Sequence, residues 1–177
     1  NPCVEAAPPR ASLQPVAWDE LRLGDRLGEG TSGVVHKASW KGEPVAVKLY
    51  KAALSSDGRS LDEVFASCAV EHEHVLKFLG YFEAPRLGAV LEWAPGLRSL
   101  GAPPSMASIT RDTYPAGARF GGRFIRRVAH SISAALAHLH SRGIAHGDCY
   151  AHNILVAPTT GDAKLSDFGA ACAARPA

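Results

Sequence analysis

The chain has 177 residues, of which 46% are hydrophobic and 20% charged, and its formal net charge is +2. This length allows one domain with a hydrophobic core, or one and a fraction. The small net charge gives no indication of a nucleic-acid partner, because a strongly basic domain is expected there. There is no membrane segment in the sequence, since no apolar run reaches the roughly 18 residues that a spanning helix needs.

The four cysteines, Cys3, Cys68, Cys149 and Cys172, have no Cys-x-x-Cys spacing, so they indicate neither a zinc site nor a disulfide framework. The start of the chain lacks the pattern of a secretory signal peptide. We therefore expect an intracellular, cytoplasmic protein. The oligomeric state is unknown from the sequence.

Residues 1–17 contain four prolines and little hydrophobic periodicity. Proline removes a backbone donor and opposes regular pairing, so we expect a disordered or extended leader. From Trp18 onwards apolar and polar residues alternate, which predicts strands. We expect a first strand from about Leu21, a second over 34–40 and a third over 45–50, with a turn at 41–44 between the last two.

A glycine-rich turn joins the first two strands. Gly28, Gly30 and Gly33 follow the pattern G-x-G-x-x-G, with Val35 two residues further on and Lys48 on the third strand. Glycines let a backbone come close to phosphates, because no Cβ stands in the way. A cation on a neighbouring strand suits the same ligand, so this hairpin predicts a phosphate-binding site.

The rest of the chain alternates between strands and helices. A helix over 60–69 is predicted by apolar residues at i, i+3, i+4 and i+7, and strands are predicted over 78–82 and 87–93. Residues 95–122 hold prolines and glycines without periodicity, which indicates a loop or local insertion. A broad apolar stripe predicts a helix over 123–141.

The residues best suited to chemistry follow that helix. Within residues 146–155, Asp148 and Asn153 stand five apart, and Asp167 opens the triplet Asp-Phe-Gly at 167–169. A carboxylate can serve as base for a hydroxyl acceptor, while a second carboxylate and an amide oxygen suit Mg²⁺. This set of residues predicts phosphoryl transfer.

Taken together, these motifs resemble the protein kinase family over about residues 21–169. Trp40-Lys-Gly before Val45-Ala-Val-Lys is similar to the tyrosine-kinase-like group. The resemblance implies an α+β, protein-kinase-like fold. Residues 18–94 would form an N-terminal lobe of antiparallel sheet plus one helix, ending in the hinge, and residues 95–177 an incomplete, mainly helical C-terminal lobe. It also implies ATP and Mg²⁺ as cofactors and a protein Ser/Thr or Tyr hydroxyl as the phosphoryl acceptor.

The resemblance assigns roles to individual residues. Asp148 would be the catalytic base, Lys48 would bind the phosphates, and Asn153 would act in catalysis and, with Asp167, hold magnesium. The remaining nucleotide-binding positions that it implies are Leu27, Gly28, Gly30, Gly33, Val35, Ala46, Leu91, the backbones of Glu92 and Ala94, and Leu155.

Lys48 also needs an acidic partner to hold its flexible side chain. Glu63, on the predicted helix over 60–69, has the spacing of that partner in kinases. Asp62 is the rival, because helical phase is uncertain by a residue or two. Glu71 is a more distant candidate.

The sequence departs from the family in two places. Gly147 stands where an Arg usually precedes the catalytic Asp, which argues against control through a phosphorylated activation loop. Tyr150 lies at a position that often separates Ser/Thr from Tyr kinases, so the acceptor type stays open. The chain begins with Asn1 and ends at Ala177, eight residues after Gly169, and we expect a fragment, truncated shortly after Asp-Phe-Gly, for which nucleotide binding is a safer prediction than turnover.

Two other classes share these residues. A small-molecule phosphotransferase of the aminoglycoside or choline kinase type has a similar His-Gly-Asp followed by Asn. A pseudokinase that binds ATP and serves as an interaction module is the third possibility. Lys48, Asp148 and Asp167 are all present, which favours an enzyme.

Overall fold

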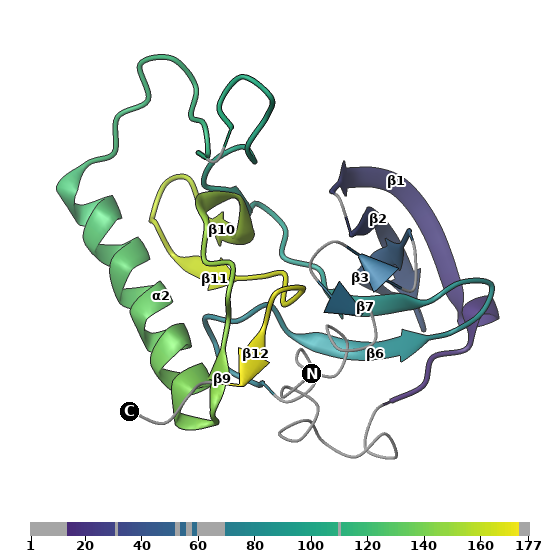
Figure 1. Ribbon diagram of the computed structural model, residues 1–177. Helices are drawn as coiled ribbons and strands as arrows, with labels where there is room; N and C mark the ends of the chain where they lie inside the picture. Colours follow the sequence, from purple (N-terminus) through teal and green to yellow (C-terminus); the bar gives the residue numbers. More distant parts are fainter. Residues whose placement is uncertain are drawn as a thin grey trace.

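The computed structural model describes residues 14–30, 32–51, 54–55, 58–59, 70–109 and 111–173. An antiparallel sheet forms one side of the molecule, and helix α2 with several short strands forms the other (Figure 1). The predicted helix over 60–69 lies outside the described residues, and so do the first thirteen residues of the predicted leader.

Five strands make up the larger sheet, in the order β1-β2-β3-β7-β6, and every neighbouring pair is antiparallel. A 3₁₀ helix, η3 (Trp18–Glu20), precedes them. A separate pair, β4 (Leu54–Ser55) and β5 (Gly58–Arg59), follows β3. The sheet strands are β1 (Leu21–Glu29), β2 (Gly33–Trp40), β3 (Glu43–Tyr50), β6 (Phe78–Phe82) and β7 (Gly88–Glu92).

The turn between β2 and β3 is shorter than the predicted 41–44. Only Lys41 and Gly42 lie outside the ladder, both with positive φ, and Glu43 already pairs with Trp40. A two-residue turn of this kind matches the twist of the strands it joins. Pro44 is tolerated in the strand because pairing with β7 begins only at Val45.

The end of the predicted leader is ordered, which corrects the boundary at residue 17. The Val16 N–H donates to the Tyr81 carbonyl at 2.7 Å, and the Tyr81 N–H donates to the Gln14 carbonyl at 3.0 Å. The Val16 side chain is buried among β-strand residues such as Val47 and Phe82. Burial of this apolar side chain and two backbone bonds outweigh the disordering effect of the prolines.

The second half is built on α2 (Gly122–Ser141), which begins one residue before the predicted helix and is followed by Gly143 at φ +69°. Glycine at this place allows the left-handed turn that ends the helix. Three short antiparallel strands, in the order β11-β10-β8, lie beside it, and β9 pairs with β12. These elements are β8 (Arg98–Ser99), β9 (Ile144–Ala145), the 3₁₀ helix η4 (Ala151–Asn153), β10 (Ile154–Val156), β11 (Ala163–Leu165) and β12 (Cys172–Ala173).

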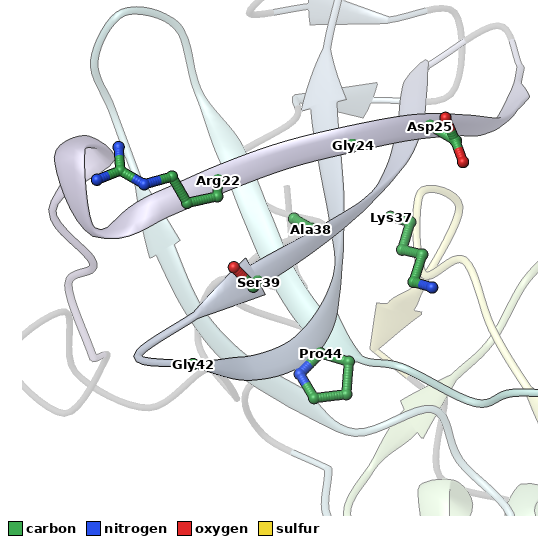
Figure 2. Close-up of a pocket in the computed structure, with 8 residues that line it drawn as sticks. All are labelled: Arg22, Gly24, Asp25, Lys37, Ala38, Ser39, Gly42 and Pro44. Carbon is green, nitrogen blue, oxygen red and sulfur yellow. The ribbon is translucent and has the colours of Figure 1, made fainter.

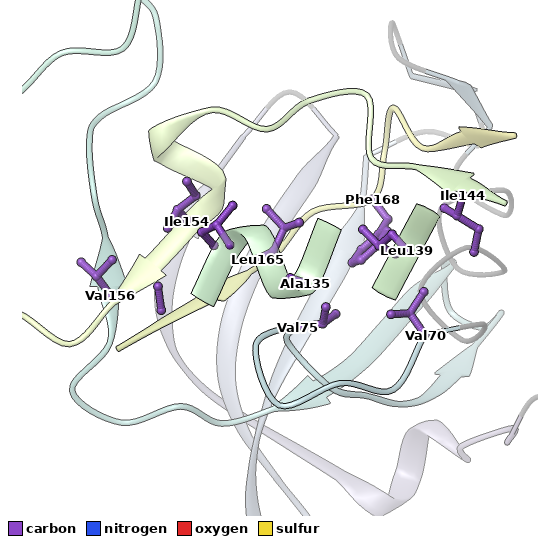
Figure 3. Close-up of a cluster of buried hydrophobic side chains, with 11 residues drawn as sticks. Val70, Val75, Ala135, Leu139, Ile144, Ile154, Val156, Leu165 and Phe168 are labelled. Atoms are coloured by element: carbon purple, nitrogen blue, oxygen red, sulfur yellow. The ribbon is translucent and has the colours of Figure 1, made fainter. Parts of the chain in front are cut away.

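One apolar cluster joins α2 to these strands (Figure 3). Ala135 and Leu139 from the helix and Leu165 from β11 are fully buried, and Val75 reaches the cluster from the segment before β6. The predicted apolar stripe of the helix therefore anchors β10, which directly follows Asn153, and β11, which ends two residues before Asp167.

The segment 95–122 is not wholly irregular, contrary to the loop predicted there. β8 pairs with β10, the Leu100 N–H donates to the Ile154 carbonyl at 2.8 Å, and Ala102 and Thr113 exchange two backbone bonds. β8 and Leu100 pair with residues more than 50 positions further along the chain, so the local sequence pattern could not show this strand.

Candidate active site

Lys48 and Asp167 meet between the two halves of the molecule. Lys48 lies on β3 and is 6% exposed, and its Nζ donates to Asp167 Oδ1 at 3.1 Å. The ammonium also lies 5.2 Å from the centre of the Tyr50 ring, a favourable cation–π distance. The sheet thus supplies a buried cation to a carboxylate carried by the other half.

Asp167 has an uncommon backbone conformation. Its φ is +61°, in the left-handed region that residues other than glycine seldom adopt. The Gly169 N–H donates to Oδ1 at 3.2 Å. Burial raises the pKa of the Asp167 carboxyl, but the Lys48 ammonium and the Gly169 N–H outweigh burial, so the pKa lies below its ordinary value. The group is therefore ionised at neutral pH.

Asp148 and Asn153 are joined across the turn that precedes β10. Asn153 Nδ2 donates to Asp148 Oδ2 at 2.8 Å and to the Asp148 carbonyl at 3.0 Å. The Asn153 carbonyl in turn accepts the Ser166 N–H at 2.9 Å. These bonds connect the turn to the residue directly before Asp167, so the three polar side chains belong to one connected site.

His146 supports this turn from inside. Its ring is 2% exposed, lies 5.0 Å from the Phe168 ring and donates from Nε2 to the Ser166 carbonyl at 3.1 Å. Its Nδ1 accepts the Asp148 N–H at 3.4 Å. Burial lowers the pKa of the His146 imidazole, although the bond to Ser166 opposes that shift. The neutral ring therefore links the Asp148 turn to the Asp167 segment.

The structure explains why glycine occupies position 147. Gly147 has φ +80°, and a Cβ there would lie 2.2 Å from the Ala170 carbonyl oxygen. No larger side chain fits without movement of the segment after Asp-Phe-Gly. An Arg at this position would therefore require the Ala170 segment to move.

The three glycines of the β1–β2 turn differ in their surroundings. A Cβ on Gly33 would lie 2.5 Å from the Leu49 carbonyl, so the fold itself requires glycine there. A Cβ on Gly28 or Gly30 would meet nothing within 4 Å. The Gly30 N–H donates to the Gly33 carbonyl at 2.9 Å. The space above the first two glycines is therefore open to a ligand.

The residues predicted around the adenine lie on β1, β2, β3, β7 and β10, with Ala94 shortly after β7. Ala46 is buried and pairs directly with Leu91 across β3 and β7. Leu27 is exposed on β1. The half-buried members of this set are Val35, Leu91 and Leu155.

Glu92 holds the connection between the halves. Its Oε1 accepts from Lys164 Nζ on β11 and from the Lys77 N–H, both at 2.7 Å. The Glu92 N–H donates to the Lys77 carbonyl at 2.9 Å, and the Ala94 carbonyl accepts the Leu97 N–H at 3.3 Å. The Glu92 N–H and the Ala94 carbonyl thus already have partners within the protein.

The predicted acidic partners of Lys48 have different outcomes. Glu63 and Asp62 lie outside the described residues, so their prediction stays open. Glu71 accepts from Lys77 Nζ at 2.6 Å on the surface. It does not pair with Lys48.

Two residues near the site were missed in the sequence. Asp112 contacts His152 from 40 positions away, through both the backbone N–H and the ring of His152. Asp112 lies in the segment without periodicity, and nothing in the local pattern linked it to His152. The bridge between Ala102 and Thr113 and the pairing of β8 with β10 bring the two segments together.

A pocket of about 310 Å³ lies elsewhere, on β1, β2 and the turn into β3 (Figure 2). It contains none of the predicted site residues. Its lining residues are Arg22, Gly24, Asp25, Lys37, Ala38, Ser39, Gly42 and Pro44.

Comparison with known proteins decides the family. The family model described as "Protein kinase domain" matches residues 21–177. The chain belongs to the protein kinase family. The predicted α+β fold, with a five-stranded antiparallel sheet followed by a partial second lobe, is thereby confirmed.

Individual relatives include kinases of both acceptor classes. The chain is 30% identical over 159 residues to the probable serine/threonine-protein kinase gdt4 of Dictyostelium discoideum, covering 87% of this chain and 9% of that protein. It is 34% identical over 157 residues to the human non-receptor tyrosine-protein kinase TNK1, and the match covers 82% of this chain and 22% of TNK1. It is 28% identical over 173 residues to the serine/threonine-protein kinase mos of Xenopus laevis, and the match covers 92% of this chain and 45% of that kinase.

The chain therefore spans less than half the length of each of these relatives. Within the described residues, no helix combines the length and hydrophobicity needed to cross a membrane.

Proposed function

We propose that this chain carries the nucleotide-binding and catalytic groups of a protein kinase that transfers the γ-phosphoryl group of ATP to a protein hydroxyl. The main support is the ion pair between Lys48 Nζ on the sheet and Asp167 Oδ1 on the other half, which lie 3.1 Å apart. Phosphoryl transfer depends on positioning and charge stabilisation, and this pair places a cation and a metal-binding carboxylate at one point.

The donor set fits a magnesium nucleotide. Among the described residues, both hydrogen bonds that Asp167 accepts fall on Oδ1, which assigns Oδ2 to a metal. Asn153 uses its Nδ2 for Asp148, which assigns its Oδ1 to the same task. Mg²⁺ prefers hard oxygen ligands and is held in such sites by few protein groups together with phosphates. When bound, Mg²⁺ neutralises charge on the phosphates.

The chain's own groups then have separate tasks. Lys48 binds phosphate oxygens, and the open backbone at Gly28 and Gly30 lies above them. Asp148, fixed by Asn153, accepts or orients the proton of the acceptor hydroxyl. The adenine lies against Val35, Ala46 and Leu155, next to the backbone of Glu92 and Ala94.

A protein acceptor is favoured by the family match over residues 21–177, which supports this class over the aminoglycoside and choline kinase type. Retention of Lys48, Asp148, Asn153 and Asp167 supports an enzyme over a pseudokinase. We also propose an intracellular, cytoplasmic location, supported by the exposed free thiols of Cys149 and Cys172.

Two measurements test this function. Mg-ATP at millimolar concentration should raise the melting temperature, since a ligand that binds only the folded chain stabilises it. Radiolabelled ATP offered with peptides and with small hydroxylated compounds should label the peptides. In the full-length protein, Asp148→Asn should abolish transfer and keep the thermal shift. A folded sample without any thermal shift, or label only on small compounds, contradicts the proposal.

A further inference from the structure

Asp112 holds His152 by two contacts. Its Oδ2 accepts the His152 backbone N–H at 3.0 Å, and its Oδ1 accepts from the ring Nδ1 at 2.7 Å. The Asp112 side chain is only 7% exposed. Because an ionised carboxylate only accepts hydrogen bonds, Nδ1 carries the proton. The other ring nitrogen, Nε2, is then the atom available on the opposite side.

That opposite side faces Asp148. His152 Nε2 lies 3.9 Å from Asp148 Oδ2, the same oxygen that accepts from Asn153 Nδ2. The Tyr150 ring stacks on the His152 ring with 5.8 Å between centroids. The carboxylate of Asp148 is thus flanked by the side chains of two consecutive residues, and Asp112 orients one of them.

The segment that carries Asp112 contacts the whole turn. The Gly101 N–H donates to the Ala151 carbonyl at 3.3 Å, and the Leu100 N–H donates to the Ile154 carbonyl at 2.8 Å. Thr113, directly after Asp112, pairs with Ala102. Residues 98–101 therefore contact residues 151–156 through their backbones, and Asp112 adds a buried polar side-chain contact to the same turn.

We propose that Asp112 is a positioning residue for phosphoryl transfer, which holds His152 so that the Asp148 carboxylate keeps its place beside Asn153. The inference rests on the proposed function, because the task of Asp148 comes from it. The turn includes a single 3₁₀ helix of three residues, which has little rigidity of its own. A supporting contact of this kind keeps a reacting group within the small tolerance that transfer requires.

The position of Asp148 can be followed without turnover. In the ¹⁵N spectrum of the full chain, the Asn153 side-chain amide reports its bond to Asp148 Oδ2. Asp112→Ala should shift this resonance, speed exchange of its protons and remove the protected His152 Nδ1 proton. Asp162→Ala is the matched control, since it removes an exposed carboxylate that pairs with Arg127, and it should leave both signals in place.

Turnover supplies the second test. In the full-length protein, Asp112→Ala should lower kcat about tenfold and leave KM for ATP within about twofold, as expected when only the groups that orient the acceptor hydroxyl are misplaced. Asp112→Asn keeps one acceptor oxygen and should give a smaller loss, and it replaces the Ala variant if that variant does not fold. An unchanged Asn153 amide in a folded variant, or equal losses in kcat and ATP affinity, overturns the proposal.

The two proposals fail in different ways. Absence of a Mg-ATP thermal shift in the wild-type chain contradicts the proposed function, while the Asn153 and His152 signals still decide whether Asp112 holds the turn.

Discussion

Lys48 Nζ and Asp167 Oδ1 lie 3.1 Å apart although 119 positions separate the two residues in the chain. One is supplied by the central strand of the sheet and the other by the segment after β11. This pair directly links the glycine-rich hairpin to the Asp-Phe-Gly triplet.

Replacement of Lys48 by Met should change how stability depends on pH. The folded-state pKa of Asp167 is lowered, so the pair stabilises the fold above the ordinary Asp pKa and loses this effect as pH falls through the lowered value. The Asp167 side chain is 37% exposed, so the loss at pH 7 should be only about 1 kcal/mol. Urea unfolding at pH 7 and at low pH measures it.

Lys77→Met is the control for this variant, since Lys77 pairs with exposed Glu71. It should keep the Mg-ATP thermal shift, whereas Lys48→Met should lose it. A Lys48→Met chain with the wild-type pH dependence would contradict the role of the ion pair.

His146 should make the fold sensitive to mild acid. Its pKa is lowered by burial, so the unfolded chain binds a proton more readily and stability falls as pH drops below about 6.5. His146→Phe should flatten this part of the curve, while lowering stability at pH 7 because the Ser166 carbonyl and the Asp148 N–H lose their partner. Thermal melts from pH 8 to pH 5 test this, with exposed His140→Gln as control. Parallel curves for wild type and His146→Phe would argue against it.

Alanine variants of two glycines in the β1–β2 turn should have different effects, one on stability and the other on Mg-ATP binding. Gly33→Ala should destabilise the chain by about 1–3 kcal/mol, because the new Cβ meets the Leu49 carbonyl. Gly28→Ala meets nothing in the protein and should leave the unfolding free energy unchanged or slightly raised. It should instead weaken Mg-ATP binding, as measured by calorimetry. Wild-type affinity in Gly28→Ala would count against phosphate binding at this turn.

Gly147→Ala should lower the free energy of unfolding more than Gly117→Ala does. Both glycines have positive φ, but only at Gly147 would the Cβ meet another group, the Ala170 carbonyl. The left-handed backbone costs about 1–2 kcal/mol in each variant, and the clash should bring the total at Gly147 to about 3 kcal/mol or more. Denaturant unfolding of the two variants isolates the contribution of the contact with Ala170. Equal losses of unfolding free energy in the two variants would show that Ala170 moves aside freely.

Much of the site could be predicted because its signals are short and contiguous. The glycine pattern around Gly30, the strand with Lys48, and the spacing of Asp148 to Asn153 each lie within a few residues, where local geometry dictates the residue types. The apolar stripe of α2 was equally local, and the observed helix differs from the predicted one by a single residue.

The larger failures were long-range. Val16 is ordered by Tyr81, and β8 exists because β10 lies beside it. Each partner is more than 50 positions away. Pairing over such distances depends on how whole elements pack, which no local pattern records.

By itself, the sequence determined which groups this protein has for chemistry: a strand-borne lysine, two aspartates, an asparagine and an open glycine turn. Tertiary structure alone decided that Lys48 reaches Asp167 and that Asp112 reaches His152. Residue identity and spacing are encoded locally, whereas contact between distant side chains follows from the apolar packing of α2 and the strands against each other.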